Sequence, residues 1–273
     1  MPRLLGFEKP IASLEKQLET LVAHTSSSSD LDLDPEIRAL RKKIDVARTG
    51  LVASLDPLDR ARLAHHPDRP TAHDYIRDIF TDVIEIKGDR TETDDDAIFC
   101  GFATIDDVKC VIVAQEKGQG GNNAKSAAFR KALRAARLAE KFRLPLVTLV
   151  DTADDLPNMG AEPIAQNIRA FTSLETPILS VVIGEGGTST ALAIGIADRT
   201  LMLENAYYPS AVPHTAQELF ARGFIDGIVP EPPGGAHLDV SSAGAALSES
   251  ILLALHELAE ISLDILLATR GKK

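Results

Sequence analysis

A glycine-rich turn at residues 184–190, Gly-Glu-Gly-Gly-Thr-Ser-Thr, is the segment best suited to chemistry, and it lies between an apolar run and a run of small residues. Glycine lets a ligand approach the backbone closely, and the first N–H groups of a helix have no partner within that helix. Such N–H groups bind anions or stabilise an oxyanion. The turn matches neither a Walker loop nor a Gly-x-Gly-x-x-Gly site. Taken alone, the turn fits an ordinary strand-to-helix connection, which is common, with backbone-based catalysis as the alternative.

A basic stripe is expected on a helix predicted over residues 124–142. Its members are Arg130, Arg134, Arg137 and Lys141. Spacings of four, three and four place them on one helix face, which suits the binding of phosphate groups. A solvated face paired with acidic neighbours is an equal alternative. Lys117 and the adjacent Gly118, between a strand end and this helix, are further candidates for contacting an anion or substrate.

The elements that position these residues alternate between short apolar runs and helical patterns. Strands are expected at 98–104, 108–114, 146–151, 178–184 and 200–203, and helices at 124–142, 162–174, from 190, and at 216–222. The runs at 146–150 and 178–183 are continuously apolar, as in strands covered on both faces. Repeated strand–helix units predict an α/β domain. A last apolar helix, expected over 245–269, carries charges that make it a packing helix.

Two helical patterns, over 11–21 and 37–47, precede this domain and form a predicted hairpin. A polar stretch at 26–35 separates them. Each helix has one apolar stripe, which must dock either on the following domain or on another chain. A turn-rich segment at 65–70 marks a boundary. We therefore expect a helical extension over residues 1–70 and the main domain over 71–273.

The composition excludes several classes of function. The 273 residues include 29 basic and 40 acidic side chains, for a net charge of −11, which disfavours nucleic-acid and membrane partners. Cys100 and Cys110, the two cysteines of the chain, lie in apolar runs and are expected to be buried free thiols. The histidines show no ligand spacing, so no metal site is expected. The first residues lack a signal-peptide pattern, which predicts a cytoplasmic location.

Six motif regions, in order along nearly the whole chain, form a specific combination. They are Phe-Glu-Lys-Pro-Ile at 7–11, Ala-His-His-Pro-Asp-Arg-Pro at 64–70, residues 88–90 with 94–98, Phe-Arg-Lys-Ala-Leu-Arg at 129–134, residues 183–187 with 191–195, and residues 225–226 with 229–232 and 234–237. Together they resemble the carboxyltransferase α subunit of multisubunit acetyl-CoA carboxylase.

The resemblance implies a crotonase-like α/β fold of stacked ββα units, here with the N-terminal helical hairpin. It implies an α2β2 assembly with active sites between α and β subunits. In this family CO2 passes from biotin on a carboxyl carrier protein to the thioester acetyl-CoA, giving malonyl-CoA, and backbone N–H pairs hold the reacting anions. Gly186, Gly187, Ser189 and Thr190 are therefore the implied catalytic positions. The family's zinc belongs to the β subunit.

The chain departs from the family's pattern in three places. Ser189 and Thr190 replace a second glycine pair, and the β-branched Thr190 would crowd a ligand. Asp154 lies where the family has a Pro-Gly-rich substrate-binding loop, with a turn-forming role as the alternative. The family's Ser-Pro-Glu-Gly stretch is missing, because residues 207–213 run almost directly into the helix at 216–222.

Three hypotheses follow. The first is an α-type carboxyltransferase subunit, acting on acetyl-CoA or a thioester with a related acyl group, in either the carboxylating or the decarboxylating direction. The second is a structural or regulatory partner in a carboxylase-like complex that has lost catalysis. The third, a crotonase-like thioester hydrolase, is weaker because no acid–base pair emerges. The hairpin and the last helix carry more apolar stripe than one domain covers, so a hetero-oligomer is expected.

Overall fold

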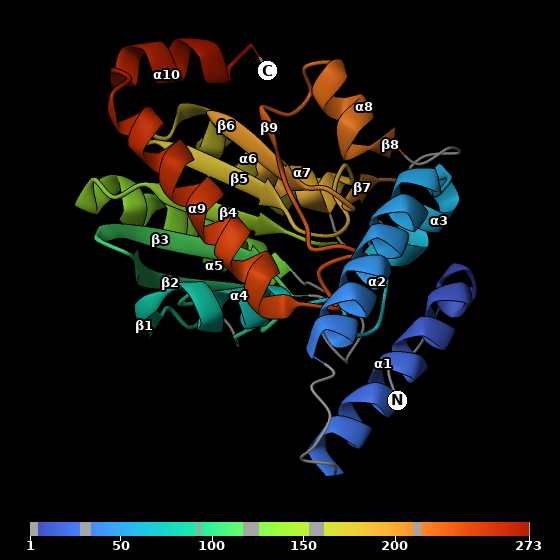
Figure 1. Ribbon diagram of the computed structural model, residues 1–273. Coiled ribbons are helices and arrows are strands. Elements are labelled where there is room, and N and C mark those ends of the chain that lie inside the picture. Colours follow the sequence, from blue (N-terminus) through green and yellow to red (C-terminus); the bar gives the residue numbers. More distant parts are fainter. Residues whose placement is uncertain are drawn as a thin grey trace.

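One mixed sheet, in the order β1-β2-β3-β4-β5-β6-β9, organises the computed structural model (Figure 1). The structure describes residues 5–27, 34–91, 94–116, 126–152, 161–209 and 214–272. The strands of this sheet are β1 (Thr81–Glu85), β2 (Ile98–Ile105), β3 (Val108–Gln115), β4 (Leu146–Val150), β5 (Ile178–Val182), β6 (Arg199–Leu203) and β9 (Gly227–Val229). Neighbours from β1 to β3 are antiparallel, and those from β3 through β9 are parallel. A separate pair joins β7 (Tyr207–Tyr208) to β8 (His214–Thr215).

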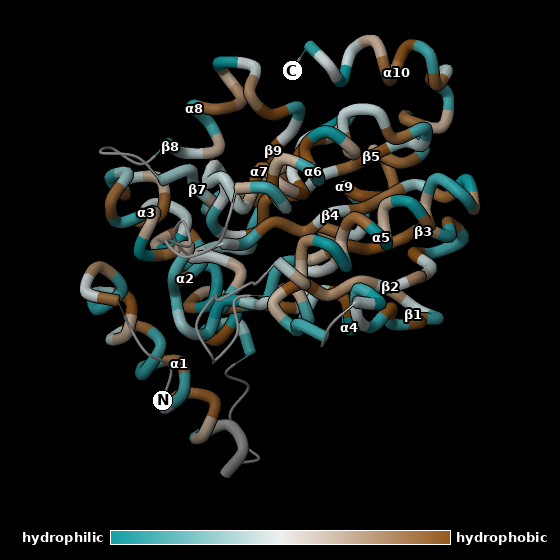
Figure 2. Tube along the Cα trace, turned by 180° about the vertical axis from the view of Figure 1, so that it is seen from behind, coloured by the Kyte–Doolittle hydropathy of each residue, from teal (hydrophilic) through white to brown (hydrophobic). Residues whose placement is uncertain are grey.

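Helices cover both faces of the sheet, as the continuous apolar strands require. The helices that follow residue 71 are α4 (Ala72–Ile79), α5 (Ser126–Phe142), α6 (Ala161–Ser173), α7 (Ser189–Gly195), α8 (Ala216–Ala221), α9 (Val240–Ala259) and α10 (Leu263–Arg270). Figure 1 shows α4 and α9 in front of the sheet. Seen from behind, α5, α6 and α7 cover the other face, over strands coloured as hydrophobic (Figure 2). Every residue of β4 and β5 is buried, which confirms the prediction of two-sided cover. The α/β fold is the one expected.

The N-terminal helices are η1 (Gly6–Glu8), α1 (Lys9–Ser27), α2 (Asp34–Ser54) and α3 (Pro57–Ala64). The first two α-helices pack side by side as the expected hairpin (Figure 1). The α2 stripe is buried at Ile37, Ile44 and Val52. Gly234 and Leu238, from the segment before α9, line a small gap together with residues of α1 and α2. The hairpin therefore docks, at least along this contact, on its own chain.

The predicted helix at 245–269 is two helices. Helix α9 ends at Ala259, and Ser262 has extended backbone angles that start α10 in a new direction. The buried Arg270 of α10 donates to both carboxylate oxygens of Asp198 at 2.7 and 2.8 Å. Its guanidinium also donates to the carbonyls of Phe171, Leu174 and Thr176. This buried ion pair fixes α10 against α6, a long-range contact that helical periodicity does not reveal.

Two further expectations bear on composition. Cys100 and Cys110 are free and buried, as predicted, and burial raises the pKa of each thiol to about 12. Among the described residues, no helix is both long enough and apolar enough to cross a membrane.

Candidate active site

The glycine-rich turn connects β5 to α7 at the carboxyl edge of the parallel strands. Asp151, directly after β4, accepts a hydrogen bond from the Glu185 N–H at 2.9 Å. A Cβ atom on Gly184 would stand 2.3 Å from the Asp151 Oδ1, so only glycine fits at that position. The turn is thus held closely against the end of the neighbouring strand.

Gly186 and Gly187, two of the predicted catalytic residues, lie against the ring of Tyr208. A Cβ on either would come within 2.8 Å of that ring, and Gly187 has a φ of +84°. The Gly186 N–H already donates to the Tyr207 carbonyl at 3.0 Å. The Gly187 N–H has no acceptor among the described residues, and this glycine is exposed. The structure therefore leaves Gly187, rather than Gly186, able to donate to a ligand.

Thr188 begins helix α7 as its N-cap, and its Oγ1 accepts from the Ala191 N–H at 3.1 Å. The same oxygen lies 2.9 Å from the hydroxyls of both Thr152 and Thr190. Gln115 Nε2 donates to the Thr190 carbonyl at 2.8 Å. The Thr190 side chain is thus buried in a hydrogen-bonded cluster, whereas Ser189 is exposed. The expectation that Thr190 crowds a ligand stays a prediction.

A buried ion pair between Arg69 and Glu231 contacts the residue before the turn. Both residues lie in the motif regions described above, but their pattern did not predict a role for them. Arg69 Nη1 and Nη2 donate to the Glu231 carboxylate at 2.9 and 2.7 Å. Arg69 also donates to the carbonyl of Ile183, the residue before the turn. Burial alone would raise the pKa of Glu231, but the Arg69 charge and the hydrogen bonds from Arg69 and Asn205 hold it below its ordinary value. The pair is therefore charged and fixes the start of the turn.

A second contact joins the turn to the end of α3. His65 Nε2 lies 2.7 Å from the Tyr207 hydroxyl and 3.1 Å from the Glu185 carboxylate. Glu185 is buried, whereas the His65 side chain is partly exposed. Nothing in the spacing of these three residues indicated that they meet. The N-terminal helices are thus coupled to the backbone that presents Gly187.

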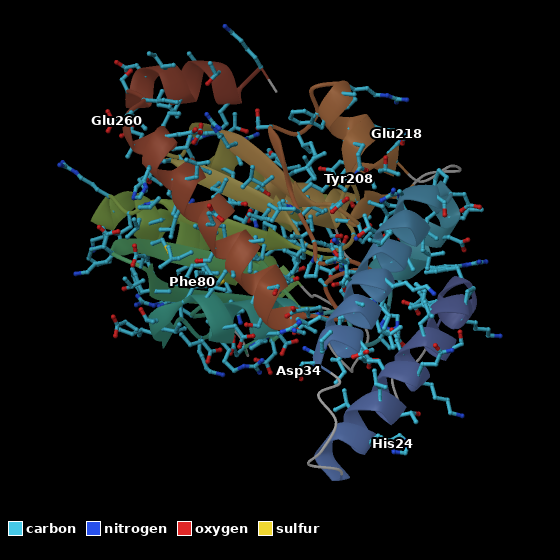
Figure 3. All side chains as sticks on the ribbon, viewed as in Figure 1. His24, Asp34, Phe80, Tyr208, Glu218 and Glu260 are labelled. Carbon is cyan, nitrogen blue, oxygen red and sulfur yellow. The ribbon has the colours of Figure 1, made fainter. Side chains whose placement is uncertain are left out.

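An apolar cavity of about 400 Å³ opens beside the turn, between α7 and α8, and is called here the α7–α8 cavity. Tyr208 forms part of its wall, and Figure 3 shows this side chain close to α8. The strands contribute Val150, Ser180, Val182 and Thr200; the turn and α7 contribute Gly187, Thr188, Ala191, Leu192 and Gly195; and the remaining lining residues are His214, Leu219, Arg222 and Phe224. Gly187 therefore lies at a cavity large enough to hold a small ligand.

The basic stripe is partly engaged within the chain. Arg130 Nε donates to the Asp89 carboxylate, and Arg134 Nη1 donates to the carbonyls of Lys87 and Gly88. These contacts fasten α5 to the segment after β1 and favour the alternative of pairing with neighbours over phosphate binding. Lys117, Gly118 and Asp154 lie outside the described residues, so their candidate roles stay predictions.

His66 and His237, which lie far apart in the sequence, stack their rings on each other. The His66 and His237 ring centroids are 3.9 Å apart, and His237 Nε2 lies 3.2 Å from the Glu8 carboxylate. These three side chains are close enough for a metal ion. However, His66 Nδ1 accepts a hydrogen bond from the Asp68 N–H, so a neutral His66 carries its proton on Nε2 and has no free lone pair for a metal. The cluster instead fastens the N-terminal segment to the loop before α9.

Comparisons with known proteins agree with the motif analysis. The family described as "Acetyl co-enzyme A carboxylase carboxyltransferase-like" matches residues 4–214 and 209–273. The acetyl-coenzyme A carboxylase carboxyl transferase subunit alpha of Actinobacillus pleuropneumoniae serotype 5b is 37% identical over 305 residues, covering 98% of this chain and 96% of that protein. The subunit of the same description from Gemmatimonas aurantiaca is 35% identical, covering 99% and 96%.

Solved structures share the fold at low sequence identity. The geranyl-CoA carboxylase beta subunit of P. aeruginosa has a TM-score of 0.53 at 18% identity, covering 82% of this chain and 48% of that one. Transcarboxylase 12S, solved with methylmalonyl-coenzyme A, has a TM-score of 0.51 at 19% identity, covering 64% and 41%. Both likenesses bear out the expected crotonase-like carboxyltransferase fold.

Proposed function

Because the chain belongs to the acetyl-CoA carboxylase carboxyltransferase-like family, as an α-type subunit, we propose that it transfers CO2 between carboxybiotin and the acyl group of a CoA thioester. The carboxylating direction gives malonyl-CoA from acetyl-CoA, or the corresponding product from a related acyl group. The observation that carries the proposal is the N–H of Gly187, which has no acceptor among the described residues and belongs to a residue that lines the α7–α8 cavity.

In the carboxylating direction the acyl α-carbon loses a proton to the ureido nitrogen that is freed when the N–CO2 bond of carboxybiotin breaks, and the resulting enolate forms the new C–C bond with CO2. The negative charge on the thioester oxygen of this enolate must be stabilised while the bond forms. A fixed backbone N–H suits this role, because it donates to a developing oxyanion without reorganising. Gly187 supplies such a donor, and the packing of Tyr208 against both glycines holds its direction. Arg69 acts through the Ile183 carbonyl, as a positioning residue for the turn. Carboxybiotin supplies the CO2 when it is bound.

The proposal includes partners. A β-type subunit completes the site with further donors, a biotin carboxyl carrier protein presents the cofactor, and the assembly is α2β2 in the cytoplasm. Residues 1–70 form the helical extension, and residues 71–273 form the carboxyltransferase domain. The structural neighbour described as a malonate decarboxylase MdcD-MdcE hetero-dimer supports pairing of two such folds; its TM-score is 0.50 at 18% identity, and it covers 68% of this chain and 95% of that one.

The direct test is affinity purification of the chain from its own cells, followed by identification of co-purifying proteins and an assay of malonyl-CoA decarboxylation with free biotin. A β-type subunit with biotin-dependent turnover is the expected result. If no such subunit is found, the proposal fails and the fold alone has been inherited.

A second candidate is a non-catalytic subunit of a carboxylase-like complex. It is favoured by two observations: the Gly186 N–H is already bonded to the Tyr207 carbonyl, and the Thr190 side chain fills the start of α7. The double substitution Ser189→Gly and Thr190→Gly, assayed in the complex with the β-type partner, separates the two. A gain in carboxyl transfer supports the catalytic reading, whereas inactive parent and variant complexes support the second candidate.

A further inference from the structure

We propose that His65 is a positioning residue for carboxyl transfer: its Nε2–H, through the Glu185 carboxylate, holds the glycine-rich turn so that the Gly187 N–H faces the reacting oxygen. The inference rests on the carboxyltransferase function proposed above and adds a residue that acts without touching the substrate. It is separate from the Arg69 contact, which reaches the turn through the Ile183 carbonyl.

Glu185 is tied by its backbone to the end of β4. Its N–H donates to the Asp151 Oδ1 at 2.9 Å, and its carbonyl accepts from the Thr152 N–H at 3.0 Å. Asp151 and Thr152 follow directly after β4, so both bonds fasten the turn to that strand. Neither bond fixes the Glu185 side chain, whose carboxylate is held by a different element.

Tyr207 in β7 flanks the turn on its other side. The Tyr207 N–H donates to the Gly184 carbonyl, and the Gly186 N–H donates to the Tyr207 carbonyl, both at 3.0 Å. The next residue, Tyr208, packs its ring against Gly186 and Gly187. A shift of β7 would therefore move the surface against which the glycine pair rests.

His65 joins the turn and β7 at one atom. Its Nε2 lies 3.1 Å from the Glu185 carboxylate and 2.7 Å from the Tyr207 hydroxyl, and the two rings meet edge to face. A carboxylate only accepts hydrogen bonds, so the contact with Glu185 requires a proton on Nε2. His65 is the C-cap of α3. The imidazole therefore links α3, the turn and β7.

The burial of Glu185 explains why the turn would depend on this contact. The Glu185 side chain is 2% exposed, whereas the His65 side chain is 39% exposed. A buried carboxylate that loses its donor is strongly destabilised and is drawn toward water. Because Glu185 belongs to the turn, its movement would carry the backbone at Gly187 with it. A misplacement of about 1 Å at a reacting centre costs about a hundredfold in rate.

Two substitutions separate the N–H of His65 from its ring. His65→Phe keeps an aromatic ring beside Tyr207 but has no N–H, whereas His65→Gln has no ring but keeps an N–H donor as many bonds from Cα as Nε2. Arg62→Met is the matched control, because Arg62 lies on the same helix and pairs with Asp59 rather than with the turn. Circular dichroism and a sizing column check the folding and assembly of each variant.

The experiment uses the complex of this chain with its β-type partner and measures malonyl-CoA decarboxylation with free biotin. We expect His65→Phe to lower kcat by about 10- to 100-fold and to change the KM for malonyl-CoA and for biotin less than about twofold, because the lost alignment acts in the transition state. His65→Gln should keep kcat within about threefold, since it keeps the donor that fixes the turn. Arg62→Met should match the parent.

The double variant His65→Phe with Glu185→Gln tests the route through Glu185. Neutralising the buried carboxylate removes the charge that draws the turn toward water, so kcat should recover by about fivefold or more over His65→Phe. If His65→Phe alone does not fold, Glu185→Gln should restore folding. A double variant that recovers neither activity nor folding would refute the route.

Amide hydrogen exchange in the same complexes gives a readout that does not depend on activity. His65→Phe should speed exchange at the Glu185 and Gly186 N–H groups, which are bonded in the parent, whereas His65→Gln and Arg62→Met should not. A parent complex without turnover would refute the proposed function, and faster exchange in His65→Phe would still support the positioning role. Unchanged exchange would refute that role.

Three kinetic results would overturn the inference. Full kcat in His65→Phe would show that the N–H is not needed. Equal losses in His65→Phe and His65→Gln would show that the shape of the imidazole, rather than its N–H, supports the turn. A raised KM with unchanged kcat would place His65 in substrate binding instead of in the alignment of Gly187.

Discussion

Arg69 and Glu231 form a buried, two-pronged ion pair whose cation also holds the carbonyl of Ile183. The arginine follows α3, the glutamate follows β9, and the carbonyl belongs to the residue before the glycine-rich turn. One guanidinium thus joins three distant segments of the chain. The geometry of the turn depends on this contact as well as on its own glycines.

We expect Arg69→Met to lower the free energy of unfolding by about 3–5 kcal/mol, because it leaves the Glu231 carboxylate buried without its cation. Urea denaturation followed by circular dichroism measures this. Arg62→Met is the matched control, since Arg62 pairs with Asp59 at the surface, and its effect should stay below about 1 kcal/mol. Similar losses in both variants would contradict a special role for the buried pair.

The pH dependence of that loss has a defined sign. In the parent, the pKa of Glu231 is lowered, so its contribution to stability is complete above its ordinary value of 4.5 and is lost as pH falls through the lowered folded value. In Arg69→Met, burial without the cation raises that pKa, and protonation relieves the penalty as pH falls. The difference in unfolding free energy between parent and variant should therefore shrink from about pH 7 to about pH 4.5. A gap that widens over this range would refute the assignment.

Gly184→Ala should destabilise the fold by about 1–3 kcal/mol, because the new methyl group would overlap the Asp151 carboxylate. Gly50→Ala should instead be neutral or stabilise by about 0.5–1 kcal/mol, since it replaces a helical glycine with open space around it. Thermal unfolding of the two variants side by side gives the comparison. A tolerated Gly184→Ala would mean that Asp151 moves aside easily.

Removing the cap of α7 should have a measurable cost. Thr188→Ala loses the acceptor for the Ala191 N–H and the contacts to two threonine hydroxyls, so we expect a loss of about 1–2 kcal/mol. Thr188→Ser keeps the hydroxyl and should recover most of that loss. Urea midpoints of the two variants decide the matter: equal losses would show that the methyl group, rather than the hydroxyl, stabilises the turn.

Much of the fold could be predicted because its signals are local. Continuous apolar runs indicated the central strands β4 and β5, and helical periodicity indicated α1, α2 and α5. Strand β1 was not predicted, because all five of its residues are exposed and the strand lies at the sheet edge. The break between α9 and α10 was also missed, since the apolar pattern continues through it and backbone angles at Ser262 decide the direction.

The site was predictable only in outline. Glycine spacing placed the turn correctly, because small residues between a strand and a helix are a local signal. Glycine spacing could not show that the Gly186 N–H donates to the Tyr207 carbonyl, or that the Tyr208 ring packs against both glycines. These contacts come from another strand. Likewise, a serine in an apolar strand gave no sign that Ser180 lines the α7–α8 cavity.

The contact between Glu8 and His237 joins residues 229 positions apart. A ribosome releases the first helices long before it has made the loop that contains His237. During that interval the apolar stripe of the hairpin lacks part of its final cover, and nascent chains with such exposed surface are prone to associate. The order of synthesis therefore gives a chaperone, or a partner subunit made nearby, a period in which to bind the hairpin before its own chain does.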